Sequence, residues 1–347
     1  MKQICSVILL FLFSCKVDPK INAPLPSDDL KEIIPPGWPQ PVYTFSVNTI
    51  SEDKFILGRS LFYEDMLSKN DSISCASCHQ QFVAFANAAH KFSHGIHDQL
   101  GNRNAPGIFN VNWHPAFMHD GGINHIEVQP LGPISNPVEM GEKIENVIAK
   151  LQNSEKYRKL FKNAFGDDEV TSQRMLRSMA LFMGMMYSYN SKFDQYKRGE
   201  NGVQLNDAEA RGYNLFQAKC NSCHVEPLFS DFKFRNIGLS PDPVLKDSGR
   251  YRITKLNTDI YRFKTPSLRN VALTYPYMHD GRYATIEQCI EHYNSGIAMT
   301  INLDPLFSGG SMPISAQEKA DLVAFLNTLT DNNFFIDNRF SDPNFKK

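Results

Sequence analysis

The chain has 347 residues, of which 42% are hydrophobic and 21% charged, and its formal net charge is −1. This length predicts two domains, and the balanced charge excludes the basic face that nucleic-acid binding needs, so we expect no nucleic-acid partner. In the body of the chain, no apolar run reaches the length of a membrane span.

The first fifteen residues form a separate segment. A lysine precedes a short apolar stretch that ends in Leu12-Phe13-Ser14-Cys15, which is typical of a signal peptide. Its last residues resemble a bacterial lipoprotein cleavage box, so we predict a signal peptide over 1–15 with Cys15 as the lipidated first residue of the mature chain. The alternative is an ordinary signal peptide with an incidental cysteine. Prolines recur through residues 16–45, which we predict to be a tether from a lipid anchor on the periplasmic side of a bacterial envelope.

Two motifs of the same form follow in the body of the chain. They are Cys75-Ala76-Ser77-Cys78-His79 and Cys220-Asn221-Ser222-Cys223-His224. C-x-x-C-H is the frame of c-type haem attachment, in which the two thiols bond the porphyrin and the histidine, His79 or His224, reaches the iron. A C-x-x-C pair alone could be a redox dithiol, half of a zinc site or a disulfide. Two copies, each followed by histidine in an exported chain, favour two covalently bound haem c groups.

An internal repeat relates the two halves of the chain. Residues 106–121, PGIFNVNWHPAFMHDG, align without gaps on residues 266–281, PSLRNVALTYPYMHDG. We therefore expect a mainly α fold with two cytochrome c-like helical haem domains, related by internal duplication and containing little β structure. The predicted boundaries are 46–195 for the N-terminal haem domain and 196–347 for the C-terminal one.

Apolar periodicity predicts the main helices. Residues 141–161 have apolar side chains at helical spacing, and 174–187 are apolar on most sides, so their methionines are expected to fill a core. Thr285 with Gln288, and Ser315 with Glu318, form capping boxes that predict the starts of two further helices.

Five segments resemble the bacterial di-haem cytochrome c peroxidases, including their MauG branch. They are SISCASCHQQFVAF, HGIHDQLGNRNAP, PLGPISNPVEMG, CNSCHVEPLFSDFKFRNIGL and TPSLRNVALTYPYMHDG, and the similarity runs from about residue 57 to 329. The resemblance implies a peroxidatic haem in the N-terminal domain and an electron-transfer haem in the C-terminal domain. It also implies reduction of hydrogen peroxide to water, a small periplasmic electron donor such as a cytochrome c or a cupredoxin, and a homodimer as a frequent state.

The same resemblance implies the residues of the peroxidatic site. His94 corresponds to the distal histidine, a switchable sixth ligand of the first iron, with His97 and His90 as rivals in sequence. Gln129 corresponds to the distal-pocket glutamine and Glu139 to the catalytic acid–base, which would move a proton between the oxygens of the peroxide. The alternative for Glu139 is a cap of the helix that begins near residue 141.

Two further sites follow from the resemblance. Asn104, Thr274 and Pro276 correspond to the ligands of a calcium ion between the haem domains. Tyr293 lies seventeen residues after Pro276, where peroxidases have a methionine and MauG a tyrosine, so it is predicted at the second iron. The alternative is a core tyrosine, with ligation by Met278, Met299 or Met312.

One position departs from the family pattern. His119 occupies the place where relatives have a tryptophan between the haems, and Trp113 is offset from it by six residues. A histidine there could bond a propionate or change charge near neutral pH, but it is harder to oxidise than an indole.

Three functions therefore compete. The leading one is a di-haem peroxidase. The second is a MauG-like oxidase that acts on a partner protein through a high-valent di-haem state, as Tyr293 suggests. The third is a non-enzymatic electron carrier or sensor, which retention of Gln129 and Glu139 disfavours.

Overall fold

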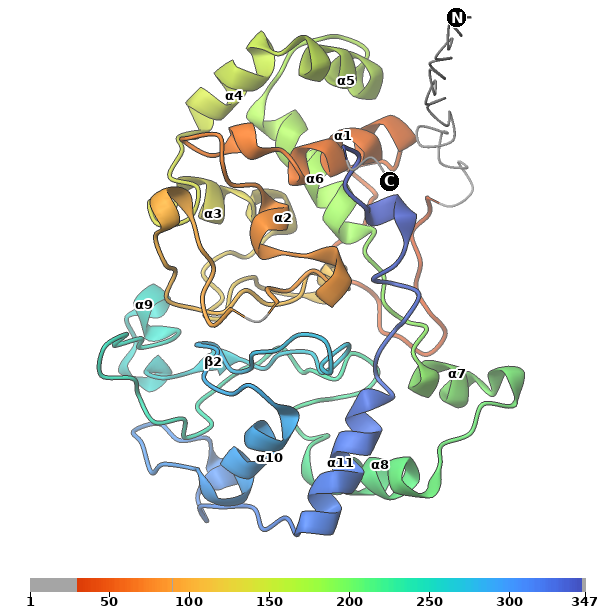
Figure 1. The fold of residues 1–347 in the computed structure, drawn as a ribbon, viewed down its shortest axis with the longest axis vertical. Helices are drawn as coiled ribbons and strands as arrows, with labels where there is room; N and C mark the ends of the chain where they lie inside the picture. Colours follow the sequence, from red (N-terminus) through yellow and green to blue (C-terminus); the bar gives the residue numbers. More distant parts are fainter. Residues whose placement is uncertain (1–29, 89, 345–347) are drawn as a thin grey trace, which may run out of the picture.

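The structure is a computed structural model that describes residues 30–88 and 90–344 (Figure 1). Cys15 and the predicted signal peptide lie outside the described residues. Within these two ranges, none of the helices combines the length and apolar character that crossing a bilayer requires.

Helices and loops make up almost all of the described chain, which confirms the mainly α prediction. Figure 1 shows α1 to α6 in one half of the molecule and α8 to α11 in the other, with α7 beside the second half. Two strands, β1 (Phe234–Arg235) and β2 (Phe263–Lys264), pair antiparallel with Phe234 opposite Lys264. The helices are α1 (Glu52–Phe62), α2 (Cys75–Cys78), α3 (Leu131–Ser135), α4 (Ile144–Asn153), α5 (Glu155–Phe165), α6 (Ser172–Gly184), α7 (Lys192–Arg198), α8 (Asp207–Lys219), α9 (Tyr251–Thr254), α10 (Ile286–Ser295) and α11 (Ala316–Asn327).

Local sequence signals account for most helix ends. Both predicted capping boxes are present, at Thr285 for α10 and at Ser315 for α11. The expected continuous helix over 141–161 is instead two helices, because Ser154 has extended backbone, ends α4 and caps α5 by accepting from the N–H of Tyr157. The methionines of α6 are buried, as predicted for core residues.

The duplication is visible where helices cross. In the first half, α1 crosses α6 so closely that a Cβ on Gly58 would lie 2.0 Å from the carbonyl oxygen of Ser178. In the second half, α8 crosses α11 in the same way, and a Cβ on Gly212 would lie 1.9 Å from the carbonyl oxygen of Asp321. Each half therefore depends on one glycine for the contact between its first and last long helices.

The repeated segments share an unusual backbone. Asn110 and Asn270 both adopt positive φ, 52° and 56°, and Met118 and Met278 do so at 65° and 71°. Each copy then closes a small loop through an antiparallel bridge, Phe117 with Ile123 and Tyr277 with Tyr283.

The two asparagines tie both copies to one linking segment. Ser188, between α6 and α7, donates its N–H to Asn110 Oδ1 at 2.9 Å and accepts from Asn110 Nδ2 on its carbonyl at 2.8 Å. Asn270 donates to the Ser188 hydroxyl at 2.9 Å and accepts from the N–H of Asp331 at 2.9 Å. All four residues are buried, so these hydrogen bonds hold both copies of the repeat against the segment around Ser188 that links α6 to α7.

The ends of the described chain cross between the halves. Phe334 and Phe340, after α11, pack in the core of the first half. Within the described part of the predicted tether, the ring of Trp38 lies 5.0 Å from that of Trp113, whose indole N–H donates to the carbonyl of Pro39 at 2.8 Å.

Candidate functional site

A single cavity of about 1310 Å³ runs between the two halves and is lined by both C-x-x-C-H motifs. The lining includes Cys75, Cys78 and His79 from the first half and Cys220, Cys223 and His224 from the second. A pocket for one drug-sized ligand measures about 300–1,000 Å³. The volume and the two attachment motifs therefore suit two prosthetic groups.

Both motif histidines are oriented to bind a metal. The Nδ1 of His79 donates to the carbonyl of Phe85 at 2.9 Å, and the Nδ1 of His224 donates to the carbonyl of Phe229 at 3.1 Å. These bonds fix the tautomer and leave Nε2 as the nitrogen for iron. Burial lowers the pKa of both imidazoles, so they are neutral, as a metal ligand must be.

The cysteines fit haem attachment better than the alternatives. All five described cysteines are free thiols. Burial raises the pKa of Cys75 and of Cys220 to about 12, which disfavours the thiolate that a redox dithiol needs. Over residues 30–88 and 90–344, no three His, Cys, Asp or Glu side chains gather in a way that could hold a metal ion.

Gln129 and Glu139 both line the cavity. Burial raises the pKa of Glu139, although a hydrogen bond of 2.6 Å from Asn136 Nδ2 to its Oε1 opposes the rise. Helix α4 begins at Ile144 with Lys143 as its N-cap, so Glu139 is not the helix cap that the sequence allowed. A carboxyl group with a raised pKa beside the first motif is suited to proton transfer.

His94 lies at the edge of this region. Its side chain is 45% exposed and its Nδ1 is 2.5 Å from Asp98 Oδ1; Ser93 and Gly95 line the cavity, but His94 does not. A Cβ on Gly95 would lie 2.1 Å from the carbonyl oxygen of Val138, so the loop of His94 packs on the segment that carries Glu139. The rivals His90 and His97 are exposed, and the distal role of His94 stays a prediction.

Tyr293 lines the cavity on the side of the second motif. Burial raises the pKa of its phenol, with smaller contributions from the neighbouring Cys289, Cys220 and Cys223. Met278 and Met312 also line the cavity, whereas Met299 is 70% exposed and does not. Ligation by Tyr293, with Met278 or Met312 as rivals, stays a prediction.

His119 lies at the junction of the two halves. Its Nε2 donates to the carbonyl of Asn104 at 2.9 Å, and the N–H of Asn104 donates to the carbonyl of His279 at 2.8 Å. Burial lowers the pKa of His119 to about 4, so the ring is neutral at pH 7. Burial therefore disfavours a charge change at neutral pH, and a bond from His119 to a propionate stays a prediction.

The predicted calcium ligands line the same cavity. Asn104 belongs to the first half, and Thr274 and Pro276 belong to the second. They offer amide and carbonyl oxygens, which calcium accepts. The site remains a prediction.

Sequence reasoning missed two cations in this cavity. Arg103 bonds Asp247 and Asp120 at 2.6 Å each, and so joins the two halves. Lys264 donates its ammonium to the carbonyl of Ala116 at 2.6 Å. The contacts that link Arg103 to Asp247 and Lys264 to Ala116 each join residues more than a hundred positions apart, so they leave no spacing pattern to detect. Lys264 nevertheless lies two residues before the second repeat.

Comparison with known proteins agrees with this geometry. A sequence profile of the di-haem cytochrome c peroxidase family matches residues 52–202. The methylamine utilization protein MauG of Methylorubrum extorquens is 33% identical over 300 residues, which cover 84% of this chain and 82% of that protein. The cytochrome c551 peroxidase of Nitrosomonas europaea is 35% identical over 296 residues, covering 82% of each.

Solved structures agree as well. A MauG-like protein associated with microbial copper homeostasis superposes with a TM-score of 0.79 at 34% identity, covering 89% of this chain and 98% of that one. The di-haem peroxidase BthA of Burkholderia thailandensis, at 24% identity, supports the fold with a TM-score of 0.72 over 83% of this chain and 88% of its own. The chain therefore belongs to the di-haem cytochrome c peroxidase and MauG family, carries two haem c groups and is an oxidoreductase.

Proposed function

We propose that this protein reduces hydrogen peroxide to water with electrons from a small periplasmic redox protein, such as a cytochrome c or a cupredoxin. The observation that carries the proposal is Glu139, a partly buried carboxyl group with a raised pKa in the wall of the cavity that the first haem motif also lines. Haem iron, when bound there, supplies the centre at which the oxygen–oxygen bond breaks and electrons arrive.

The roles of the surrounding residues follow from peroxide chemistry. Cleavage needs one proton moved from the near oxygen to the leaving oxygen, and each peroxide consumes two electrons and two protons to give two waters. Glu139 accepts and returns the proton, and Asn136 holds its Oε1 in place. Gln129 offers an amide to orient the peroxide. His94, on a loop tied to Glu139 by the Ile96 N–H at 2.7 Å, would occupy the first iron until that loop moves.

Steady-state turnover with peroxide and reduced cytochrome c tests the proposal. We expect Glu139→Gln to lower kcat by about 10²–10⁴-fold, because the amide keeps the shape but carries no exchangeable acid. Glu145→Gln, on the exposed face of α4, is the matched control and should be unchanged. Absence of turnover in the wild-type protein, even after half-reduction, would exclude a peroxidase.

Tyr293 keeps a second function open, oxidation of a partner protein as in MauG. Its phenol, in the cavity wall beside the second motif, is placed to act at the second haem. Electron paramagnetic resonance of the ferric protein and of Tyr293→Phe tests this. A changed signal of the second haem supports phenolate ligation, and an identical signal transfers the role to Met278 or Met312.

The remaining assignments are also proposals. Calcium binds at Asn104, Thr274 and Pro276, and chelation should loosen the junction between the halves. The protein works on the periplasmic side of the envelope, held by lipid on Cys15. The homodimer is a proposal from family resemblance alone.

A further inference from the structure

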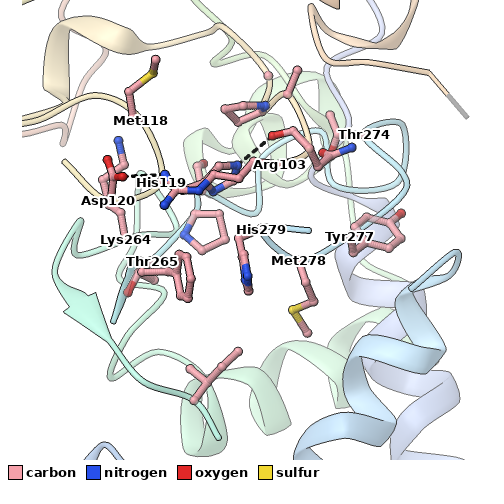
Figure 2. A pocket seen from close by; sticks show the side chains of 18 of the residues that line it. Arg103, Met118, His119, Asp120, Lys264, Thr265, Thr274, Tyr277, Met278 and His279 are labelled. Carbon is pink, nitrogen blue, oxygen red and sulfur yellow. Dashed lines mark hydrogen bonds and ion pairs between the residues drawn. The ribbon is translucent and has the colours of Figure 1, made fainter. Parts of the chain in front are cut away.

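A lysine from the second half of the chain reaches into the wall formed by the first half. The N–H of Lys264, at the end of β2, donates to the carbonyl of His119 at 2.7 Å. Its ammonium donates to the carbonyl of Ala116 at 2.6 Å, and the ring of Phe117 lies 6.0 Å away. Figure 2 shows Lys264 with Asp120 and His119 on the same side of the cavity. The ammonium is therefore anchored on the first copy of the repeat.

The charge of Lys264 is incompletely satisfied. An ammonium has three donors, and among the described residues Ala116 is the acceptor that we identify for it. Asp120 attracts it, but the oxygens of that carboxylate are engaged by Arg103 at 2.6 Å and by the N–H of Gly122 at 3.0 Å. Burial lowers the pKa of Lys264 to about 8, so the group still carries its charge at neutral pH.

The guanidinium groups that line the same cavity differ from Lys264. Each of the four is paired with carboxylates of the protein: Arg103 with Asp120 and Asp247, Arg235 with Asp231 and Asp304, Arg282 with Asp280, and Arg252 with Asp247 at 3.9 Å. A partly buried ammonium whose only neighbouring carboxylate among the described residues is bonded by other groups is costly. The cavity wall leaves this charge to be balanced by an anionic group inside the cavity, and haem carries two propionate carboxylates.

We propose that Lys264 is the counter-charge of a propionate of the haem attached through Cys75 and Cys78, and that it raises the reduction potential of that haem. The inference rests on haem attachment in the proposed function. The assignment to the first haem follows from Ala116 and Phe117, which belong to the first half. A nearby positive charge favours the ferrous state, because reduction removes one positive charge from the iron.

The test is a spectroelectrochemical titration of the holoprotein, with the two haems resolved by their absorption and electron paramagnetic resonance signals. Lys264→Met removes the charge at similar length, Lys264→Arg keeps it, and Lys233→Met removes an exposed lysine next to β1 as the matched control. We expect Lys264→Met to lower the potential of the first haem more than that of the second. Lys264→Arg and Lys233→Met should leave both potentials near those of the wild type.

Two results would overturn the proposal. One is a fully loaded Lys264→Met protein with both potentials unchanged, and the other is a shift at the second haem that equals or exceeds that at the first. If Lys264→Met does not accumulate with two haems, Lys264→Gln, whose uncharged amide retains N–H donors, is measured by the same criteria. The potentials are measured without peroxide or donor, so an inactive enzyme with a shifted first potential would contradict the proposed function and not this inference.

Discussion

The two copies of the repeat make the same turn and then diverge. After Gly121, the first copy continues into a short 3-10 turn and the five-residue α3, whereas after Gly281 the second continues into the ten-residue α10. Pro130 and Pro133 account for the difference, because proline lacks the N–H that a helix interior requires. The first copy, in which the helix is interrupted, has Gln129 and Glu139 in the cavity wall. The second copy, in which the helix is continuous, has Tyr293 there.

The buried aspartates of the two turns show the same divergence. Asp280 is paired within its own turn by Arg282, two residues later. Asp120 has Gly122 at that position and is paired instead by Arg103, which also bonds Asp247 of the second half. The two copies thus share the turn, but Asp280 is paired locally, whereas the partner of Asp120 also bonds a carboxylate of the other half.

The largest expected effect tests the position where the copies differ most in polarity. Arg269 stands opposite Phe109 in the repeat alignment, is buried and bonds Asp194 twice at 2.8 Å. We expect Arg269→Met to lower the free energy of unfolding by about 3–5 kcal/mol, because it leaves a buried carboxylate unpaired. Phe109→Met, the matched change in the first copy, should cost about 1 kcal/mol. Denaturant unfolding of the holoprotein measures both.

The loss in Arg269→Met should depend on pH. Burial raises the pKa of Asp194, but hydrogen bonds from Arg269 hold it below its ordinary value. The stabilisation is therefore present above the ordinary pKa of aspartate and is lost as the pH falls through the lowered pKa. The difference between variant and wild type should shrink in acid. A difference that is the same at pH 7 and at a pH well below the ordinary pKa of aspartate would contradict a role through this ion pair.

Replacing the glycine at the helix crossing should destabilise the protein by a similar amount in both halves. Gly58→Ala and Gly212→Ala each place a methyl group within 2.0 Å of a backbone oxygen, so each should destabilise by about 1–3 kcal/mol despite the higher helix propensity of alanine. Gly309→Ala, which has open space around it, is the control. Calorimetry gives the comparison, and a loss in one half alone would show that the two crossings are not equivalent.

Of the two halves, only the first has a predicted acid–base residue, Glu139. We therefore expect a single acid limb in the pH profile of kcat/KM, and we assign it to this residue. Glu139 must be ionised to accept a proton from peroxide, so kcat/KM should fall about tenfold per pH unit below its pKa. Burial raises that pKa, which moves the limb above the ordinary range of glutamate. The limb should survive in Tyr293→Phe and disappear in Glu139→Gln. Its persistence in Glu139→Gln would assign it to another group.

Local signals in the sequence were enough for much of this fold and for the haem motifs. Two C-x-x-C-H frames, a gapless repeat and the capping residues Thr285 and Ser315 each act over a few neighbouring residues, so pattern alone identified them. The glycine crossings at Gly58 and Gly212 depend on backbone contacts more than a hundred residues away in sequence, which no local pattern records.

The protonation states and contacts of individual site residues could not be predicted from the sequence. Capping of α4 by Glu139 was compatible with the sequence and is excluded by the position of Lys143. The neutral state of His119 follows from burial, which depends on the packing of both halves. Lys264 has no partner in its own segment, and its role emerges only where β2 meets the first repeat.

The smallest expected effect is that of replacing His119, and it concerns electron transfer between the two haems. It is equivalent to His279 in the repeat, but it stands where relatives have a tryptophan, and its bond to Asn104 joins it to the predicted calcium site. An indole is easier to oxidise than a neutral imidazole, so His119→Trp should speed electron transfer between the haems. Stopped-flow absorbance, recorded after peroxide is mixed with the half-reduced protein, measures this rate.

The control is His119→Phe, which adds bulk without an easily oxidised ring and so separates the redox property from packing. Equal acceleration in both variants would point to packing, and unchanged transfer and turnover in both would leave His119 as a residue that holds the two halves together through Asn104.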